Sequence, residues 1–411
     1  MSDPLLALAL VLAQQPATLE LSRGLWFDGR SFTPTTWYAV DGKLTHERPA
    51  QVDRVLDLEG GFVVPPFGEA HNHNVYDGAE ATLARYLEQG IFYVKNPNSL
   101  PRQTTSVRAL VNRPDGVDVV FSGGSITAPG GHPVELVENN VKRGTWTEAD
   151  GEGAFYFTVR DRAELDAKWP AIVAQPRDFL KTFLLYSEEY ERRRDDPASI
   201  GWRGLDPALL PAIVERAHEH GWRVSTHVET ATDFHHAVAA GVDEINHMPG
   251  FRADQARDFA AYRIAEEDAR RAAACHVVVV TTLGGLLDAL EAVSPEHPDR
   301  ARADECLDMV LHNLEILQAN RVTVALGSDE FEGSAQHEAL ALARLGVIDP
   351  ATLLRMWCED TPRAIFPGRE IGRFEAGFEA SLLVLAGDPL ASFERVRDIR
   401  LRVKQGRVLE R

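Results

Sequence analysis

Two histidines separated by one residue, His71 and His73, have the spacing of a metal-binding pair. They follow residues 62–65, a short apolar segment that we predict to be a strand. In an extended chain, residues i and i+2 point to the same side, so both imidazoles can reach one ion. Imidazole nitrogen is a common ligand of zinc and other divalent metals. The His-x-His pattern therefore indicates a metal site, although alone it has low specificity.

A second pair, His218 and His220, has the same spacing in a different context. It lies at the end of a helix predicted over residues 207–220 and is followed by Gly221. On a helix, residues i and i+2 do not face each other. We therefore interpret these two histidines as cationic groups near a helix C-terminus rather than as metal ligands.

Other residues that can bind a metal or move a proton stand in, or shortly after, apolar segments. Each segment has the composition of a buried strand. These residues are Lys181 in segment 180–185, His227 at the end of 223–227, His247 at the end of 244–247, and Asp329 shortly after 322–327.

The middle of the chain alternates such segments with helical patterns, which would bring these residues together. Helices are predicted over 79–88, 207–220, 301–319 and 336–345, and helix starts at Asp349-Pro350 and Thr361-Pro362. The eight apolar segments are 62–65, 91–95, 117–121, 180–185, 223–227, 244–247, 276–281 and 322–327. Eight strands alternating with helices predict an α/β fold, a (β/α)8 or TIM-type barrel. The C-terminal strand ends of such a barrel form one mouth, where we expect four histidines, a lysine and an aspartate to converge.

Both ends of the chain contain short alternating segments and turn signals, from residue 17 to 46 and from about residue 371 onward. We therefore predict a small β-sandwich domain formed by both termini. The predicted division is an apolar N-terminal segment over 1–16, the sandwich over 17–61 and 366–411, and the barrel over 62–365.

Residues 4–13 are apolar and leave two interpretations open. As the hydrophobic region of a secretory signal they would place the protein in the periplasm or outside the cell, although the start of the chain has no positive charge. As a short element packed on the body they would fit a cytoplasmic protein.

The charge and composition exclude several classes of protein. The 411 residues include 43 basic and 62 acidic residues, a net charge of −19, which disfavours binding to nucleic acid. No apolar run reaches the roughly 18 residues that a membrane span needs. Three widely spaced cysteines make neither a disulfide framework nor a zinc ribbon. We expect a small-molecule substrate, and a homodimer is the default assembly.

The order of these residues resembles the metal-dependent amidohydrolase superfamily, in its prolidase-like dipeptidase and imidazolonepropionase-like branch. The family pattern is His-x-His on strand one, lysine on strand four, histidines on strands five and six, and aspartate on strand eight. All six positions match, and the resemblance extends from about residue 17 to 411. Two positions depart from the pattern, since Glu69 and Ser381 stand where the family commonly has aspartate.

The resemblance implies a binuclear metal centre, with zinc as the first choice of metal, held by His71, His73, Lys181, His227, His247 and Asp329. It implies that Lys181 is carboxylated by carbon dioxide and bridges the two ions. A metal-activated hydroxide would cleave an amide-like C–N bond in a small peptide or cyclic amide, with Asp329 as general base and then acid. The enzyme would then be an amidohydrolase or peptidase.

Two further residues are expected to contact substrate. His132 follows the third predicted strand, in the long connection over residues 123–178, and Tyr186 follows the fourth. A solvated loop position remains the alternative for His132. The other histidines lack a position at a strand end and are interpreted as structural: His235, His236, His276, His297, His312 and His337.

Three alternatives remain open on the same scaffold. A mononuclear deaminase or imidazolone-type hydrolase would leave Lys181 as a free amine. The same hydroxide could also cleave an ester or a lactone. A non-catalytic scaffold protein is disfavoured, because such relatives lack several metal positions and this chain keeps all six.

Overall fold

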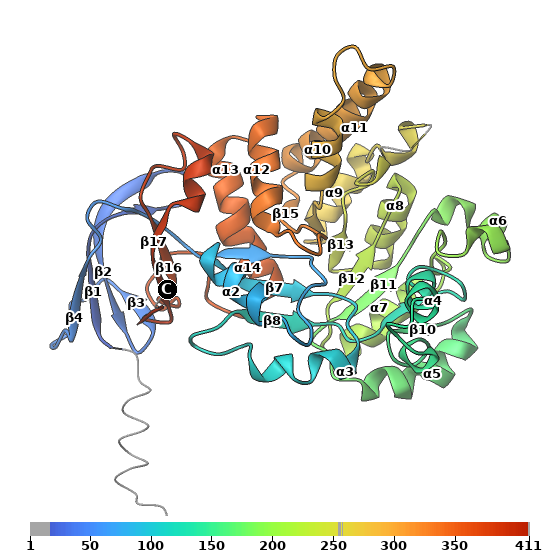
Figure 1. Cartoon of the computed structure of the whole chain (residues 1–411), viewed down its shortest axis with the longest axis horizontal. Helices are drawn as coiled ribbons and strands as arrows, with labels where there is room; N and C mark the ends of the chain where they lie inside the picture. The colour runs from blue at the N-terminus through green and yellow to red at the C-terminus, as the bar shows by residue number, and fades with distance from the viewer. Residues whose placement is uncertain (1–16, 254–255, 257, 410–411) are drawn as a thin grey trace, which may run out of the picture.

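The computed structural model describes residues 17–253, 256 and 258–409, so the apolar segment 4–13 lies outside the described residues. The described chain contains one sheet built from both ends of the sequence and two parallel sheets with helices around them (Figure 1). The fold is therefore of the α/β class with parallel sheets. In the described part of the chain, no helix combines the length and apolar character that a membrane crossing requires.

The first sheet joins strands from the two ends of the chain, in the order β18-β17-β16-β5-β1-β2-β3, with β4 on β1. Alternate residues of β1 are buried, as in a sheet with one face on a core. In Figure 1 it lies at the left of the molecule. Its strands are β1 (Leu19–Phe27), β2 (Phe32–Val40), β3 (Lys43–Thr45), β4 (Arg54–Asp57), β5 (Phe62–Val64), β16 (Leu382–Leu385), β17 (Ile399–Lys404) and β18 (Arg407–Val408).

The two parallel sheets carry the residues of interest. One has the order β6-β7-β8 and the other the order β10-β9-β11-β12-β13-β14-β15. Hydrogen bonds connect the sheets, from Ala70 N to Leu326 O (2.9 Å) beyond β6 and β15, and from Asp178 N to Phe121 O (2.8 Å) beside β8. The strands are β6 (Phe67–Glu69), β7 (Ile91–Asn96), β8 (Asp118–Phe121), β9 (Ser125–Thr127), β10 (Tyr156–Thr158), β11 (Leu180–Phe183), β12 (Val224–His227), β13 (Glu244–Asn246), β14 (Val278–Val280) and β15 (Thr323–Ala325).

The prediction that residues 62–65 form the first strand of the parallel set is wrong. That segment is β5, which pairs with β1 and β16 in the sheet of the two termini. Pro65 and Pro66 have no N–H to donate and separate it from β6, which takes the predicted place. The sequence also gave no expectation of β9 and β10, which lie within the long connection after β8.

Helices pack around the parallel sheets and supply the connections between strands (Figure 1). Thr230 and Asp233 form a capping box at the start of α8, and Asp349 caps α13 through a bond from Thr352 N (3.0 Å). The helices are α2 (Glu80–Glu88), α3 (Pro101–Thr104), α4 (Val134–Lys142), α5 (Arg162–Ala174), α6 (Tyr190–Arg193), α7 (Leu210–Glu219), α8 (Ala231–Ala240), α9 (Glu266–Ala274), α10 (Gly284–Glu291), α11 (Arg300–Ala319), α12 (Ala335–Leu345), α13 (Pro350–Arg355) and α14 (Thr361–Ile365).

A π-helical turn, Met356–Asp360, joins α13 to α14 and supports β6. α14 begins at Thr361 as predicted, but Thr361 does not cap it, because the preceding residues are already helical. Its hydroxyl instead donates to Met356 O (2.7 Å) and accepts from Leu326 N (2.9 Å). Trp357 stacks on Phe67 with ring centroids 3.7 Å apart. This turn thus holds both β6 and the segment after β15 in place.

Candidate metal centre

The ends of β6 and β15 lie side by side and bring His71 next to Asp329. Asp329 N donates to His71 O at 2.8 Å. Gly327 allows this approach, since a Cβ at that position would lie 2.8 Å from both the N and the Cβ of His71. Two segments that are far apart in the sequence therefore present an imidazole and a carboxylate at one point.

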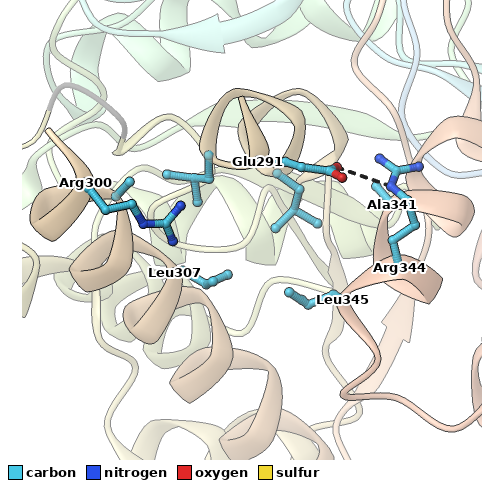
Figure 2. A pocket seen from close by; sticks show the side chains of 9 residues that line it. Glu291, Arg300, Leu307, Ala341, Arg344 and Leu345 are labelled. Atoms are coloured by element: carbon cyan, nitrogen blue, oxygen red, sulfur yellow. Dashed lines mark ion pairs between the residues drawn. The ribbon is translucent and has the colours of Figure 1, made fainter. Parts of the chain in front are cut away.

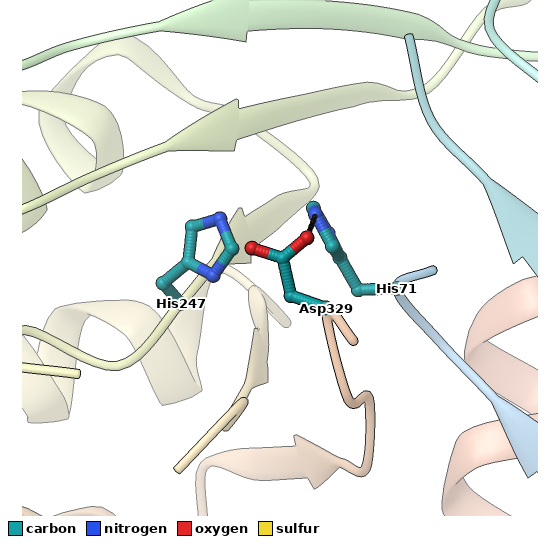
Figure 3. Close-up of side chains that lie close together, drawn as sticks. All are labelled: His71, His247 and Asp329. Carbon is teal, nitrogen blue, oxygen red and sulfur yellow. Dashed lines mark ion pairs between the residues drawn. The ribbon is translucent and has the colours of Figure 1, made fainter. Parts of the chain in front are cut away.

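Three side chains converge there, those of His71, His247 and Asp329. One potential ligand atom from each lies within 4.8 Å of the others. Figure 3 shows the Asp329 carboxylate between the two imidazoles. Asp329 Oδ1 is 3.7 Å from His71 Nε2 and 3.3 Å from His73 Nε2. His73 therefore approaches the same carboxylate oxygen as His71.

His227 and Lys181 lie next to this group. The His227 ring centroid is 4.5 Å from that of His247. Lys181 is placed through Phe183, whose ring contacts His227 and whose centroid is 5.1 Å from Lys181 Nζ. Lys181 Nζ donates to Asn246 Oδ1 at 2.5 Å. The structure therefore brings all six predicted ligands to one region, with three of them in the tightest group.

Burial sets the electrostatics of the group. It lowers the pKa of His71, His227 and His247 well below the usual histidine value, and the nearby Lys181 charge lowers it further. Burial also lowers the pKa of Lys181 to about 7, against the opposing effect of Asp329 and Glu244. Neutral imidazoles and a readily deprotonated amine present lone pairs, which suits the binding of a divalent cation.

The backbone at this point adopts a conformation that side-chain-bearing residues rarely take. His247 has φ of 73° and Asp329 has φ of 53°, both in the left-handed region. Such conformations cost roughly 1–3 kcal/mol and persist where surrounding structure holds them. His247 is held by a bond between its Nδ1 and Thr282 Oγ1 (2.8 Å) and by stacking on Phe251 at 4.0 Å between ring centroids.

Glu69 stands where the resemblance predicts aspartate, and its side chain connects two strand ends. Among the described residues, none of its hydrogen bonds involves an imidazole ring. Its carboxylate accepts from His71 N (3.1 Å), from Ser328 N (2.9 Å) and Oγ (2.8 Å), and from Ala335 N (2.6 Å). Burial raises the pKa of Glu69 to about 8. The longer side chain thus serves to join β6 to the segment after β15. At the other departure, Ser381 Oγ accepts from Gln405 N (3.0 Å) within the sheet of the termini.

Of the two expected substrate contacts, His132 packs against His227, and Tyr186 packs against Arg193. The His132 ring centroid is 5.5 Å from that of His227, and its Nδ1 is 2.5 Å from Glu135 Oε1. Tyr186 packs against Arg193, whose guanidinium carbon is 4.1 Å from the phenol ring centroid. Burial raises the pKa of Tyr186, and the charge of Glu229 adds to that effect.

Glu229 and Arg252 were not anticipated from the sequence. Glu229 is 3% exposed, its Oε1 is 3.0 Å from His227 Nε2, and it forms an ion pair with Arg252. Burial raises the pKa of Glu229 to about 7, although Arg252 opposes the rise. In the sequence, Glu229 could have been recognised as a candidate by its position two residues after His227. Because Glu229 holds Nε2, Nδ1 is the ring atom of His227 that can face a metal.

The two rings of the second pair, His218 and His220, have separate partners, as expected for this spacing on a helix. His218 Nε2 is 2.8 Å from Asp243 Oδ2, whereas His220 Nε2 accepts from Trp169 Nε1 at 3.2 Å. Identical spacing therefore directs two rings to different partners when the backbone is helical.

Two cavities lie away from these residues. One of about 260 Å³ is lined by side chains of α10, α11 and α12. Two of the lining residues, Glu291 and Arg344, form an ion pair (3.4 Å; Figure 2). Another of about 870 Å³ lies where the sheet of the termini meets α13, near Asp28 and Arg355. Neither is lined by a predicted ligand.

Solved structures share the fold over almost the whole chain. A crystal structure of an amidohydrolase has 21% sequence identity and a TM-score of 0.71, covering 95% of this chain and 98% of that one. Ochratoxinase from A. niger has 16% identity and a TM-score of 0.73, covering 96% of each chain. A prolidase in complex with N-methylphosphonate-L-proline has 19% identity and a TM-score of 0.68, covering 96% and 100%.

The sequence itself identifies the family. The model of the amidohydrolase family matches residues 199–409, which is about half of the chain and includes His227, His247 and Asp329. A comparison with curated protein sequences finds no match. The chain therefore belongs to the amidohydrolase family and is an enzyme that hydrolyses C–N bonds.

Proposed function

We propose that this enzyme is a metal-dependent hydrolase that cleaves an amide-like C–N bond in a small peptide or a cyclic amide. The convergence of His71, His247 and Asp329 within 4.8 Å carries this proposal. The family is generally metal-dependent, and a prolidase is among the structures that share the fold.

The donor atoms fit a site for divalent cations, with zinc as the first choice. We assign the ligands to His71, His73, Lys181, His227, His247 and Asp329, with Lys181 carboxylated. Imidazoles and carboxylates are the donors that zinc favours. When bound, such cations would polarise a substrate carbonyl and make a water molecule acidic enough to supply hydroxide near neutral pH.

The side chains of the enzyme handle protons and orientation. We assign Asp329 as the general base that accepts the proton of the attacking water and returns it to the leaving nitrogen. His132 is assigned to a substrate atom through Nε2, because Glu135 holds its Nδ1 at 2.5 Å. Tyr186 is assigned to the outer wall of the substrate site.

The architecture that accompanies this function is also a proposal. We infer that β6–β8 and the longer parallel sheet close into one (β/α)8-type barrel, with the sheet of the termini as a separate small domain. The hydrogen bonds that connect the two parallel sheets support closure. The sequence predicts a barrel over 62–365, but β5 belongs to the sheet of the termini, so the proposed barrel begins after β5 and extends to about residue 365.

A mononuclear hydrolase is the second candidate. The tightest group contains only His71, His247 and Asp329, and Lys181 Nζ is bonded to Asn246. One metal and an unmodified Lys181 amine would be compatible with both observations.

The deciding experiment measures metal per chain by elemental mass spectrometry and hydrolysis of Xaa-Pro dipeptides, N-acyl amino acids and cyclic amides. We expect about two metals per chain, loss of hydrolysis on chelation and recovery with zinc. About one metal would favour the mononuclear form. No metal and no hydrolysis after incubation with zinc or manganese would overturn the proposal.

A matched pair of variants makes the measurement specific. His71→Ala/His73→Ala should lose metal, whereas His218→Ala/His220→Ala removes the same pattern from the end of α7 and should keep it.

A further inference from the structure

A chain of buried hydrogen bonds leads from Lys95 on β7 to Lys181 on β11. Lys95 Nζ donates to Glu244 Oε2 at 2.8 Å, and Asn246 Nδ2 donates to Glu244 Oε1 at 2.6 Å. Lys181 Nζ donates to the other end of the same amide, Asn246 Oδ1, at 2.5 Å. All four side chains are at most 3% exposed. We call Lys95, Glu244 and Asn246 the support chain.

The support chain has no part in the proposed chemistry, yet it places an ion pair in the interior. Removing two charges from water is costly, and apolar side chains of similar size would often serve stability as well. Fully satisfied polar networks can instead specify one arrangement of buried groups. Ser225 Oγ adds a further bond to Glu244 Oε1 at 2.9 Å, so the carboxylate is well satisfied.

The direction of the Asn246 amide follows from Glu244. An ionised carboxylate only accepts hydrogen bonds, so it selects the NH2 end of the amide. The carbonyl oxygen of Asn246 must then face Lys181. If the amide turned over, its NH2 group would face the amine of Lys181 and leave Glu244 next to an oxygen.

We propose that the support chain positions Lys181 for its carboxylation, with Asn246 as the residue that acts directly on it. This inference rests on the proposed function, in which Lys181 reacts with carbon dioxide. In that step the electron pair of the neutral Nζ amine forms an N–C bond with carbon dioxide, and one C=O π bond opens so that its electrons stay on oxygen. One proton leaves the nitrogen for solvent, and the new carboxylate carries one negative charge.

The product keeps the contact that orients it. The carboxylated nitrogen retains one N–H, which can continue to donate to Asn246 Oδ1. The three substituents of that planar nitrogen point in different directions, so an N–H aimed at Asn246 directs the carboxylate away from it. Asn246 is thus a positioning residue that would fix the direction of the new carboxylate.

The test uses the full-length protein loaded with zinc and incubated with 13C-labelled bicarbonate. The carboxylated lysine gives one labelled carbon in 13C NMR, assigned by its absence in Lys181→Ala. Asn246→Leu removes the acceptor at similar volume. Asn246→Asp keeps an acceptor but places an anion beside the new carboxylate. Thr226→Val is the control, because its hydroxyl is bonded to Thr182 Oγ1 (2.8 Å) and has no hydrogen bond to the support chain.

We expect wild type and Thr226→Val to show the labelled carbon and the same metal content. In Asn246→Leu the labelled fraction at a given bicarbonate concentration should fall several-fold, up to about tenfold, because the carboxylated nitrogen is a stronger N–H donor than the free amine and loses the stronger bond. The new carboxylate also loses the direction that this bond sets. Asn246→Asp should also fall, through repulsion. If Asn246→Leu does not fold, Asn246→Asp and the pair Lys95→Met/Glu244→Gln, which removes both charges, carry the same test.

Full labelling of Asn246→Leu would overturn the inference. A wild-type enzyme that binds metal and hydrolyses C–N bonds without any labelled carbon would also overturn it, and would leave the hydrolase proposal standing. A labelled wild type without hydrolysis would instead reject the hydrolase proposal, and the Asn246 variants would still decide the positioning role.

Discussion

Glu69 and Ser328 are 259 positions apart in the sequence and share two hydrogen bonds, from the amide (2.9 Å) and from the hydroxyl (2.8 Å) of Ser328 to the Glu69 carboxylate. They fasten the strand that leads to His71 to the segment that leads to Asp329. His71, which follows β6, and Asp329, which follows β15, are thereby held next to each other.

Removal of this connection should weaken the fold at the metal centre. In Glu69→Gln the amide NH2 would face one of the donors that now point at the carboxylate. We expect the free energy of unfolding to fall by about 2 kcal/mol. In Ser328→Ala we expect a fall of about 1 kcal/mol, because the lost hydroxyl donates to Glu69 and accepts from Asn72 Nδ2 (2.7 Å), and Asn72 keeps its bond to Glu330 O. Urea unfolding of the metal-free proteins measures both, and an unchanged midpoint for Glu69→Gln would contradict this role.

Asp329→Asn tests the assignment of the general base. The amide keeps an oxygen for a metal but cannot take up a proton, so we expect kcat to fall by about 100-fold or more. Metal content, measured on the same sample, separates loss of proton transfer from loss of metal. Turnover near the wild-type rate with metal still bound would exclude the role.

The pair of Glu229 and Arg252 should show strong coupling. In Arg252→Met the buried Glu229 carboxylate loses its counter-charge, and we expect the free energy of unfolding to fall by about 2 kcal/mol. The double variant Arg252→Met/Glu229→Gln should recover part of that loss, because no charge is then left unpaired. Urea unfolding of the four proteins gives the coupling energy, and strictly additive effects would refute the account.

His337 should give a pH-dependent contribution to stability. Burial lowers its pKa, but the hydrogen bonds and charges of Glu330 and Asp288 outweigh burial, so the net pKa is raised. The folded state therefore holds the proton more tightly than the unfolded state. The stabilisation is fully present below pH 6.5, the ordinary value, and is lost as the pH rises through the raised pKa.

The measurement compares wild type with His337→Gln by urea unfolding at pH 6 and at pH 9. The gap in the free energy of unfolding should be larger at pH 6. His297→Gln, at a side chain that is 50% exposed, controls for loss of a surface histidine. A gap that widens at pH 9 would show that the sign is wrong.

Several elements were predictable because local pattern and final environment agree. All residues of β7, β11 and β12 are buried, as in strands covered on both faces, and the apolar residues in and around them were enough to predict these strands. The helix over 301–319 likewise appears as α11, Arg300–Ala319.

Other elements escaped prediction for physical reasons. Residues 62–65 look like a strand of the parallel set, and their pairing with β1 and with β16, which lies more than 300 residues later, places them in the other sheet. β9 (SIT) and β10 (YFT) are short and contain hydroxyl side chains, so no continuous apolar run marks them in the sequence.

The sequence by itself determined the family and the residues available for chemistry, because His-x-His, a lysine, two histidines and an aspartate stand at strand ends in a fixed order. Only the tertiary structure decided which atoms meet. Glu69 joins strand ends, Glu229 holds His227, and Asn246 faces Lys181. The reason is that strand order and register set the distance between residues remote in sequence, and no local pattern contains that distance.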